Sequence, residues 1–281
     1  MSIPYQGSDG IPWSRYGTRM IATELRASEF GRQLRRWRRQ RGLSQLQLAA
    51  RAGTTPRHVS FLETGRSRPR IEMVLRLGGE LDLLPREQNA LLEAAGLRPV
   101  FPQRSLQDSD MARFRQVIEA LLEGHEPLPA AVIDRYGALR GANKAFECLT
   151  PGLVGLEPEE LVDRFFGPGP WREALVNWEE VAAAWLARQR FEARRTADPR
   201  LEALIARAEE LIGPLPPRIG RDELPVVHSR IKAGEDVLEL FTVVVRFDTA
   251  NDVTLSELRV ELMYPGNEAA DRFFRVARPG T

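Results

Sequence analysis

The sequence predicts two domains, a small all-α domain followed by an α+β domain that contains an antiparallel sheet. Five short amphipathic segments, separated by glycines and prolines, lie between residues 29 and 96, whereas period-two alternation dominates the last third of the chain. The chain has 281 residues, 43% of them hydrophobic, which is enough for more than one core. We expect a flexible arm at 1–28, a helical domain at 29–97, a linker at 98–110 and the α+β domain at 111–275.

The helical segments of the first domain are bounded by N-caps and helix breakers. A Ser or Thr side chain at a helix start accepts a hydrogen bond from a free backbone N–H, and glycine tolerates the left-handed conformation that ends many helices. The second segment is expected to turn Leu46, Leu48 and Ala49 inward. Because the pattern begins soon after Met20, that residue is an alternative start to Met1. The boundary residues, in chain order, are Ser28, Gly42, Ser44, Gly53, Thr55, Pro56, Gly65, Pro69 and Pro85.

The positive charge of the chain is concentrated in residues 31–70. This stretch carries eleven arginines, no lysine and one acid, Glu63, which gives a formal charge of +10 against +1 for the whole chain. So dense a positive block repels itself unless a polyanion shares its field, and DNA phosphate is the usual polyanion. A solvated basic face is the alternative, but the helical pattern inside the block is typical of a DNA-reading unit.

The second domain begins with a helix at 111–123 and then changes to strands. Short strands are expected at 131–134 and 138–141 around a turn at 135–137, and two long helices at 171–194 and 199–212. Strands at 226–232, 237–247 and 255–264 are expected to form an antiparallel meander. In the last strand the apolar side chains are expected to face the core and the charged ones water. These are Leu258, Val260, Leu262 and Tyr264 on the first face, and Glu257, Arg259 and Glu261 on the second.

The sequence contains no arrangement typical of an enzyme or a metal site. Its three histidines and lone cysteine lack metal-ligand spacing, and we find no phosphate-binding glycine loop or nucleophile elbow. His125, Glu126 and Asp134 lie close in sequence and would be the residues to examine for catalysis. No acid–base–nucleophile set accompanies them, so we expect no enzymatic activity, no metal and no resident cofactor.

The single cysteine and the lack of long apolar runs indicate a compartment. Cys148 cannot form an internal disulfide, which fits a reducing cytoplasm, and we expect it to be a small core residue. No apolar run approaches the roughly 20 residues that span a bilayer, and no signal-peptide core is present at the N-terminus. We therefore expect a cytoplasmic protein that does not bind a membrane.

A helix-turn-helix is predicted at residues 43–63. Leu43-Ser44-Gln45-x-x-Leu48-Ala49-x-x-Ala52-Gly53, followed by a helix at 55–63, provides two short helices and a tight turn. With Glu63-Thr64-Gly65 after it, this segment resembles the helix-turn-helix of the phage-repressor (XRE, Cro/C1-like) superfamily. The resemblance implies that the helix at 55–63 lies in the major groove of DNA.

The resemblance also implies which residues contact DNA. Arg57 is the first choice for base readout, because a guanidinium can bridge guanine O6 and N7. Gln45 is expected to touch phosphate beside the N-terminus of its helix. Phe61 either contacts a thymine methyl or packs on Trp37 or Leu62. The full set of expected DNA-binding residues is Gln45, Thr55, Pro56, Arg57, His58, Ser60, Phe61, Arg66, Arg68 and Arg70.

Arg38 and Glu63 match a position pair that forms an internal salt bridge in the superfamily. The resemblance therefore implies that Glu63 is structural and does not read bases. The prolines and Phe61 depart from the glutamine-rich form of the recognition helix, so the operator sequence does not carry over.

The start of the second domain resembles the opening of a PAS domain. There a hairpin, here Val132–Leu139, is followed by an asparagine, here Asn143, that caps the next helix. Taken with the first domain, residues 29–275 resemble a regulator of the MmyB-like family. The motifs that carry this resemblance are Arg57-His58-x-Ser60-Phe61-Leu62-Glu63-x-Gly65-Arg66, Arg76-Leu77 before Leu81-Asp82-Leu83, His125-Glu126-Pro127, Asp252-Val253-Thr254-Leu255-x-Glu257-Leu258, and Glu261 to Pro265. The resemblance implies a PAS-like ligand-binding fold with a pocket suited to a fatty acyl chain.

Aromatic and aliphatic residues of the second domain are candidates for this pocket. A helix at 171–194 would place its tryptophans along one seam, opposite apolar residues of a strand, and such linings suit apolar ligands. The alternative is that these side chains only fill the core. A carboxylate would need a cation at the pocket mouth, for which Arg140, Arg230 and Arg246 are candidates. The expected ligand-binding set is Phe165, Phe166, Trp171, Leu175, Trp178, Trp185, Phe241, Val243, Val245 and Arg246.

Together these observations predict a sequence-specific transcription regulator, in this superfamily most often a repressor. It would bind a double-stranded operator as a homodimer, because one short helix reads too few bases for useful affinity. An apolar effector, such as a fatty acid, would bias the spacing of the two DNA-reading heads. The alternative is that the second domain serves only dimerisation or protein interaction.

Overall fold

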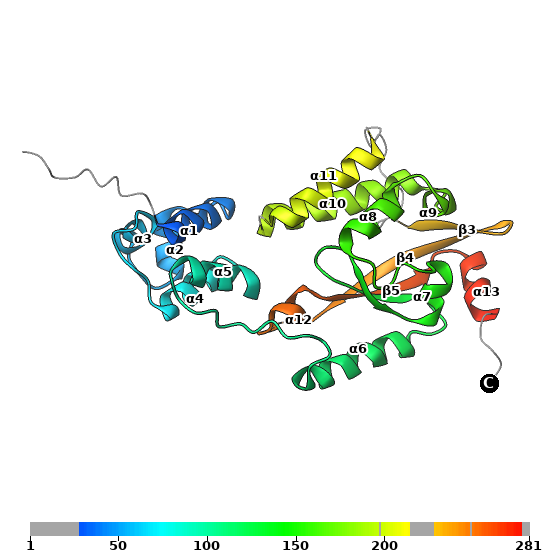
Figure 1. The fold of residues 1–281 in the computed structure, drawn as a ribbon, viewed down its shortest axis with the longest axis horizontal. Coiled ribbons are helices and arrows are strands. Elements are labelled where there is room, and N and C mark those ends of the chain that lie inside the picture. The colour runs from blue at the N-terminus through cyan, green and yellow to red at the C-terminus, as the bar shows by residue number, and fades with distance from the viewer. Residues whose placement is uncertain (1–27, 197, 214–227, 248, 277–281) are drawn as a thin grey trace, which may run out of the picture. The chain divides into compact units, whose positions relative to one another are not determined.

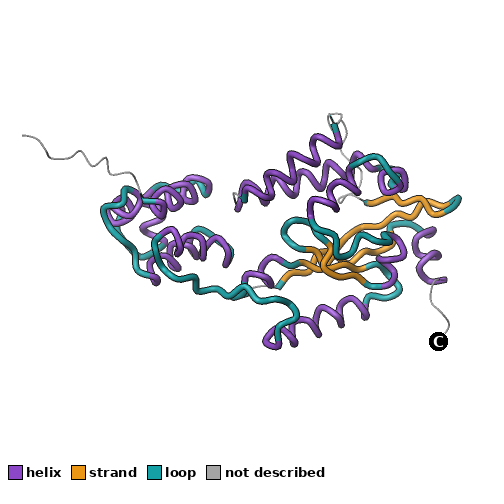
Figure 2. The backbone as a smooth tube through the Cα atoms, in the orientation of Figure 1, coloured by secondary structure: helices purple, strands orange, loops and turns teal. Residues whose placement is uncertain are grey.

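The computed structural model describes residues 28–196, 198–213, 228–247 and 249–276 (Figures 1 and 2). The arm expected at 1–28, apart from Ser28, lies outside these residues, as do the first two positions of the strand expected at 226–232. The chain divides into two compact units. The first contains the described residues up to Leu81 together with Leu91–Arg98, and the second contains Asp82–Ala90 and the described residues from Pro99 onward.

In the described residues before 98, five helices form where the sequence predicts them: α1 (Glu29–Gln40), α2 (Gln45–Arg51), α3 (Pro56–Glu63), α4 (Ile71–Glu80) and α5 (Pro85–Ala94). The predicted N-caps Ser44 and Thr55 are confirmed, because each accepts a hydrogen bond from the backbone N–H three residues later. Ser28, the expected start of the first helix, caps α1 in the same way. The division into units falls inside α5. The buried apolar side chains of these helices include Phe30, Leu34, Trp37, Leu48, Ala49, Val59, Leu62, Val74, Leu77, Leu91 and Leu92.

One predicted core residue of the first unit points outward. Leu46 is 65% exposed, whereas Leu48 and Ala49 are fully buried. Residues two apart on an α-helix are separated by about 200°, so Leu46 and Leu48 cannot share a face. The expectation for Leu46 is therefore wrong, because α2 has only seven residues and its short pattern does not separate the two faces.

The helices α1 and α3 approach each other most closely at Gly31. A Cβ at this position would lie 2.6 Å from the carbonyl oxygen of Glu63 and 2.7 Å from that of Leu62. Both distances are far shorter than a van der Waals contact. Glycine is therefore required at this crossing for α1 to pack against the end of α3.

The second unit is built on a five-stranded antiparallel sheet with the order β2-β1-β5-β4-β3. Its strands are β1 (Ala130–Ile133), β2 (Leu139–Ala142), β3 (Ser229–Ala233), β4 (Asp236–Arg246) and β5 (Arg259–Pro265). The predicted hairpin and the predicted meander of the last three strands are confirmed. Because β1 pairs with β5, the first and last strands join the two halves of the domain into one sheet.

Helices cover both faces of this sheet (Figure 1). On one face α6 packs on Val132 and Val260, and on the other Arg188 of α10 reaches Glu261 of β5. The helices α8, α10 and α11 share an apolar cluster, and α13 packs on Leu238 and Leu240. The helices of this unit are η2 (Ser109–Met111), α6 (Ala112–Gly124), α7 (Lys144–Leu149), α8 (Pro158–Phe166), α9 (Pro170–Ala174), α10 (Trp178–Thr196), α11 (Pro199–Ile212), α12 (Val253–Glu257) and α13 (Glu268–Val276).

The long helix predicted at 171–194 is in fact two helices, α9 and α10, with an extended break between them. Leu175 forms a β-bridge with Ile231 at the edge of the sheet. The side chain of Asn177 donates to the carbonyl of His228 at 2.7 Å and accepts from the amide of Arg230 at 2.9 Å. Leu175 is extended and the amide of Val176 donates to the carbonyl of Arg230, so the backbone here pairs with β3 and the helix does not continue, although the apolar period does.

The last predicted strand is also shorter than expected, and its charged face does not meet water. Asp252 caps α12, and β5 begins only at Arg259. Arg259 and Glu261 are 7% and 8% exposed, because α10 covers this face of the sheet. Arg259 donates to Glu261 at 2.9 Å and Arg188 donates to the same carboxylate at 2.8 Å. The prediction of a solvent-facing side is wrong because it assumed that only one face of the sheet is covered.

Three further expectations concern single residues and absences. Cys148 is exposed, so its assignment to the core is wrong. Within the described ranges, no helix combines the length and apolarity needed to cross a membrane. The same part of the chain contains no group of three or more potential ligands that could hold a metal ion.

Candidate functional site

The predicted recognition helix, α3, has a buried face and an open face. Val59 and Leu62 are fully buried and fix the helix on the first unit. Thr55, Pro56 and Arg57 are exposed. On the open side the structure thus brings together the expected contact residues of α3 with the exposed arginines that follow it. His58, Ser60 and Phe61 are half-buried, and Arg66, Arg68 and Arg70 are exposed.

Phe61 organises two of these arginines. The guanidinium of Arg57 lies 5.2 Å from the centre of the Phe61 ring, and that of Arg66 lies 5.8 Å from it. Cation–π contacts of this kind hold a long side chain over an aromatic face without neutralising its charge. The Trp37 ring instead lies close to Arg36 and Arg41. Phe61 therefore presents two cations on the surface of the recognition helix.

Glu63, at the end of α3, is buried and accepts hydrogen bonds from side chains of two other helices, α1 and α2. Arg38 of α1 donates to it through Nε at 2.5 Å and through Nη2 at 3.0 Å, which confirms the predicted salt bridge. The same arginine donates to the carbonyl of Leu43 at 2.7 Å. Gln45 of α2 donates to Glu63 at 2.8 Å. This network sets the angle between α1, α2 and α3, and Gln45 has one amide hydrogen left for a phosphate.

In the second unit, the ten residues expected to bind the effector do not all gather in one place. Side chains of paired strand residues share a face of a sheet. Phe241, Val243 and Val245 of β4 pair with Tyr264, Leu262 and Val260, so they lie on the α6 side. The remaining apolar members lie on the α10 side, where Phe165, Phe166, Leu175, Trp178 and Trp185 form one cluster and Trp171 packs in a neighbouring one.

Of the three candidate cations, two are already paired. Arg140 contacts Asp134 at 2.7 Å, and Arg230 lies 3.4 Å from Glu239. Arg246 has no ion pair among the residues that the structure describes. Burial lowers the pKa of Arg246, and although Glu192 opposes this, nearby arginines add to it. Among the described residues, Arg246 is therefore the one candidate of the three that is not already paired with a carboxylate.

Two features near this site were not predicted from the sequence. Gln189 of α10 is fully buried, and neither amide atom has a partner within the described residues. It lies beside Trp185 and Gly137, the latter in the turn between β1 and β2. A cavity of about 430 Å³ includes Arg246 in its lining. Its other lining residues are Leu83, Leu84, Pro85, Gln88, Phe101, Phe247, Thr249, Ala250, Asn251 and Ser256.

Neither feature has a signal in the sequence. A lone glutamine in a helix is typical of an exposed position, and the walls of the cavity come from three segments that lie far apart in the chain. Only long-range packing reveals that Gln189 is buried or that these segments meet.

A recognition helix flanked by arginines and an α+β domain with a covered antiparallel sheet together define a DNA-binding transcription regulator with a ligand-binding domain. Comparison with protein-family models supports both parts. Residues 34–87 match a helix-turn-helix model, and residues 114–277 match the model of the MmyB-like transcription regulator ligand binding domain. The second match covers more than half of the chain, so the chain belongs to this MmyB-like family. A search of curated proteins finds no match.

Proposed function

We propose that this regulator binds a two-fold symmetric operator as a homodimer in the cytoplasm, and that an apolar carboxylate, such as a fatty acid, changes its affinity for that operator. The observation that carries the DNA part is the open face of α3, where Phe61 holds Arg57 and Arg66 at the surface. Arg57 would read a guanine, and Arg68 and Arg70 would contact phosphates.

The effector site that we propose lies at the half-buried members of the cluster on the α10 side. Phe165 and Trp185 are partly open and would contact the apolar chain, while Arg246 would bind the carboxylate. Leu175 is not part of the proposed site, because it bridges Ile231, whose partner Leu238 lies eight residues along β4 from Arg246, about 26 Å away. Phe241, Val243 and Val245 lie on the other face of the sheet, so the proposal leaves them out.

The experiment is a selection of duplexes from a random DNA pool with the full-length protein, followed by anisotropy titrations with and without sodium laurate. We expect a palindromic consensus, a complex with two protein chains in native mass spectrometry, and at least a fivefold change in operator affinity with laurate. Attachment to every duplex alike, abolished by moderate salt, would refute the DNA assignment.

A domain used only for dimerisation is the second candidate. The dense burial of Phe166 and Trp178 favours it, because these side chains already fill the helical cluster. In that case native mass spectrometry of the purified protein should show dimers without a lipid-sized adduct, and laurate should leave operator affinity unchanged.

A further inference from the structure

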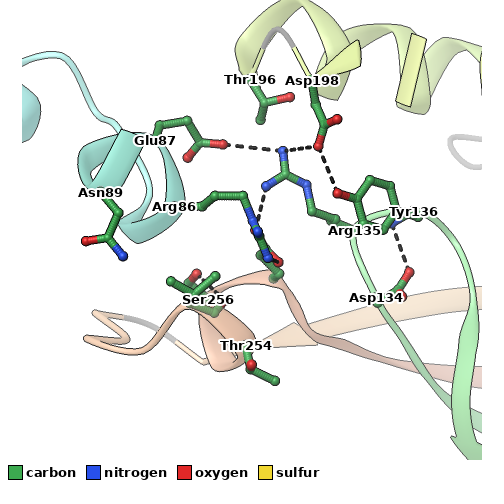
Figure 3. A network of polar contacts seen from close by, with 12 residues as sticks. Arg86, Glu87, Asn89, Asp134, Arg135, Tyr136, Thr196, Asp198, Thr254 and Ser256 are labelled. Carbon is green, nitrogen blue, oxygen red and sulfur yellow. Dashed lines mark hydrogen bonds and ion pairs between the residues drawn. The ribbon is translucent and has the colours of Figure 1, made fainter. Parts of the chain in front are cut away.

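A buried arginine, Arg135, joins three separate elements of the second unit (Figure 3). Arg135 lies in the turn between β1 and β2 and is 9% exposed. Its guanidinium contacts Glu87 of α5 at 3.3 Å, Asp198 at the start of α11 at 3.2 Å, and Glu257 at the end of α12 at 2.5 Å. We call these four residues, with Arg86 and Tyr136, the Arg135 cluster.

The Arg135 cluster fastens the first half of α5 to the ligand-binding unit. Besides the contact of Glu87, Arg86 donates to both oxygens of Glu257, at 2.6 and 2.9 Å. The side chain of Asn89 bonds to the backbone of Phe101, donating to its carbonyl and accepting from its amide. The second half of α5 belongs to the DNA-binding unit. α5 is one continuous helix, Pro85–Ala94, so the same helix belongs to both units.

On its other side the turn between β1 and β2 touches the helices that carry the proposed effector surface. The hydroxyl of Tyr136 donates to Asp198 at 3.0 Å, and the guanidinium of Arg200 lies 4.9 Å from the Tyr136 ring. Gly137 lies against Trp185 and Gln189 of α10. The turn therefore contacts α10, the start of α11 and α5.

The charges of the Arg135 cluster are not evenly matched. It contains three carboxylates and two guanidinium groups, and the second oxygen of Glu87 has no partner in the described part of the chain. Gln189, beside the same turn, is also left without one. A buried polar atom without a partner is costly, so an arrangement that supplied partners to Glu87 and Gln189 would lower the free energy of the network.

We propose that the turn bearing Arg135 relays effector occupancy from α10 and α11 to α5, and through α5 to the DNA-binding unit. The relay rests on the proposed function. A ligand against α10 that favours one position of Asp198 would favour one position of Arg135 and hence of Glu87. By linkage, operator binding would then change the affinity for the effector by the same factor. Arg135 is in this scheme a positioning residue, because it contacts neither ligand.

The test compares Glu87→Gln, Asp198→Asn and Tyr136→Phe with the wild-type full-length chain. Each change removes one connection of the relay while keeping the shape of the side chain. Arg207→Gln is the matched control, because it breaks an exposed ion pair of the same helix α11 with Asp163. Operator affinity is measured without ligand and with sodium laurate, laurate binding is followed by tryptophan fluorescence, and thermal unfolding verifies that each variant is folded.

We expect Glu87→Gln and Asp198→Asn each to shift ligand-free operator affinity at least threefold, and the double variant to shift it by much less than the product. The laurate response should fall below twofold while laurate binding stays within twofold of wild type. If all three variants match Arg207→Gln in both conditions, the relay is overturned even where laurate acts on the wild type.

The two proposals fail in different ways. A wild-type protein that binds DNA without sequence preference refutes the proposed function, and the relay falls with it. A wild-type protein that binds its operator but ignores laurate removes the fatty-acid effector. The ligand-free affinities of Glu87→Gln and Asp198→Asn then still decide for or against the relay.

Discussion

Glu63 shows how a single residue of the recognition helix can be excluded from reading bases. Its carboxylate is buried and accepts from Arg38 and Gln45, and Arg35 lies 3.6 Å away. A carboxylate surrounded by these donors organises its own domain and offers nothing to a nucleobase. The arginines that remain exposed, above all Arg57, are the ones that we propose contact DNA.

We expect Glu63→Ala to destabilise the first unit by about 3–5 kcal/mol, because it leaves the buried guanidinium of Arg38 without its counter-charge. Glu29→Ala, which breaks an exposed pair with Arg32, should cost less than about 1 kcal/mol. The stability of the first unit is measured by urea unfolding, with hydrogen exchange of the amides in α1–α3 as the probe. Equal losses in the two variants would show that the buried network has no special weight.

Arg57→Ala should relax sequence preference at one base pair per half-site, at a cost of about 1–3 kcal/mol against the preferred base. The reason is that a guanidinium held by Phe61 can form a bidentate contact with guanine, whereas alanine cannot. Selection from the random pool measures this directly. An unchanged consensus from the variant would remove Arg57 from the readout.

The raised pKa of buried Glu87 leads us to expect that the stability of the protein depends on pH. Burial raises the pKa of Glu87 above its ordinary 4.5, although Arg135 opposes the shift. Between 4.5 and the raised pKa the folded state binds more protons than the unfolded state at this group, so its contribution to stability falls as pH rises through that window.

Relative to Glu87→Gln, the wild-type protein should therefore gain stability as pH falls from 7 towards 4.5, with no further gain below. Each tenfold difference in proton affinity corresponds to about 1.4 kcal/mol. Urea unfolding of both proteins at pH 7 and pH 5 measures the difference in their free energies of unfolding. If the wild type becomes less stable relative to Glu87→Gln at pH 5, the prediction is wrong.

At the scale of elements, local chemistry was sufficient to place the helix starts of the first unit but not the helix break of the second. The starts of α1, α2 and α3 are set by Ser28, Ser44 and Thr55, and such caps are legible in the sequence because donor and acceptor are three residues apart. The break between α9 and α10 is set by contacts with β3, some fifty residues further along the chain, where Leu175 bridges Ile231 and Asn177 accepts from the amide of Arg230. No pattern within a short window carries that information.

Asn177→Ala tests whether this contact positions β3. The variant leaves the amide of Arg230 and the carbonyl of His228 without their side-chain partner, which should cost about 1–3 kcal/mol. Amide exchange at Arg230 and Ile231 should accelerate, whereas the exposed Asn251→Ala should leave it unchanged. If the amides of Arg230 and Ile231 stay fully protected from exchange in Asn177→Ala, β3 does not need this contact to keep its position.

The effector site was only partly predictable for a related reason. Alternation along β4 and β5 indicates that side chains divide between two faces, but not which helices cover each face. Phe241 and Trp185 were expected to line the same pocket, but the structure places them on opposite sides of the sheet. Arg135 and Gln189 were not singled out, because their roles arise from contacts between distant segments.

At the scale of the whole molecule, the positive charge lies in one short stretch of the sequence and the rest of the chain is acidic. Residues 31–70 carry a formal +10 and the rest of the chain a formal −9. The phosphate backbone is therefore attracted to the arginine-rich helices and repelled by the remainder.

Arg68→Ala should consequently weaken binding to all duplexes alike and reduce the slope of log K against log salt by about 1. The equally exposed Arg275→Ala, in the acidic remainder, should leave that slope as it is. Titrations at several salt concentrations measure both slopes. A loss confined to one DNA sequence would assign Arg68 to base readout instead.

The close crossing of α1 and α3 at Gly31 has a consequence for inherited variation. A methyl group there would collide with the carbonyls at the end of the recognition helix, so the helix would have to tilt or the bundle to part. Such a variant would keep every side chain that touches the double helix and still misalign all of them. A substitution at a buried helix crossing, on the side of the unit away from the open face of α3, can therefore abolish gene control.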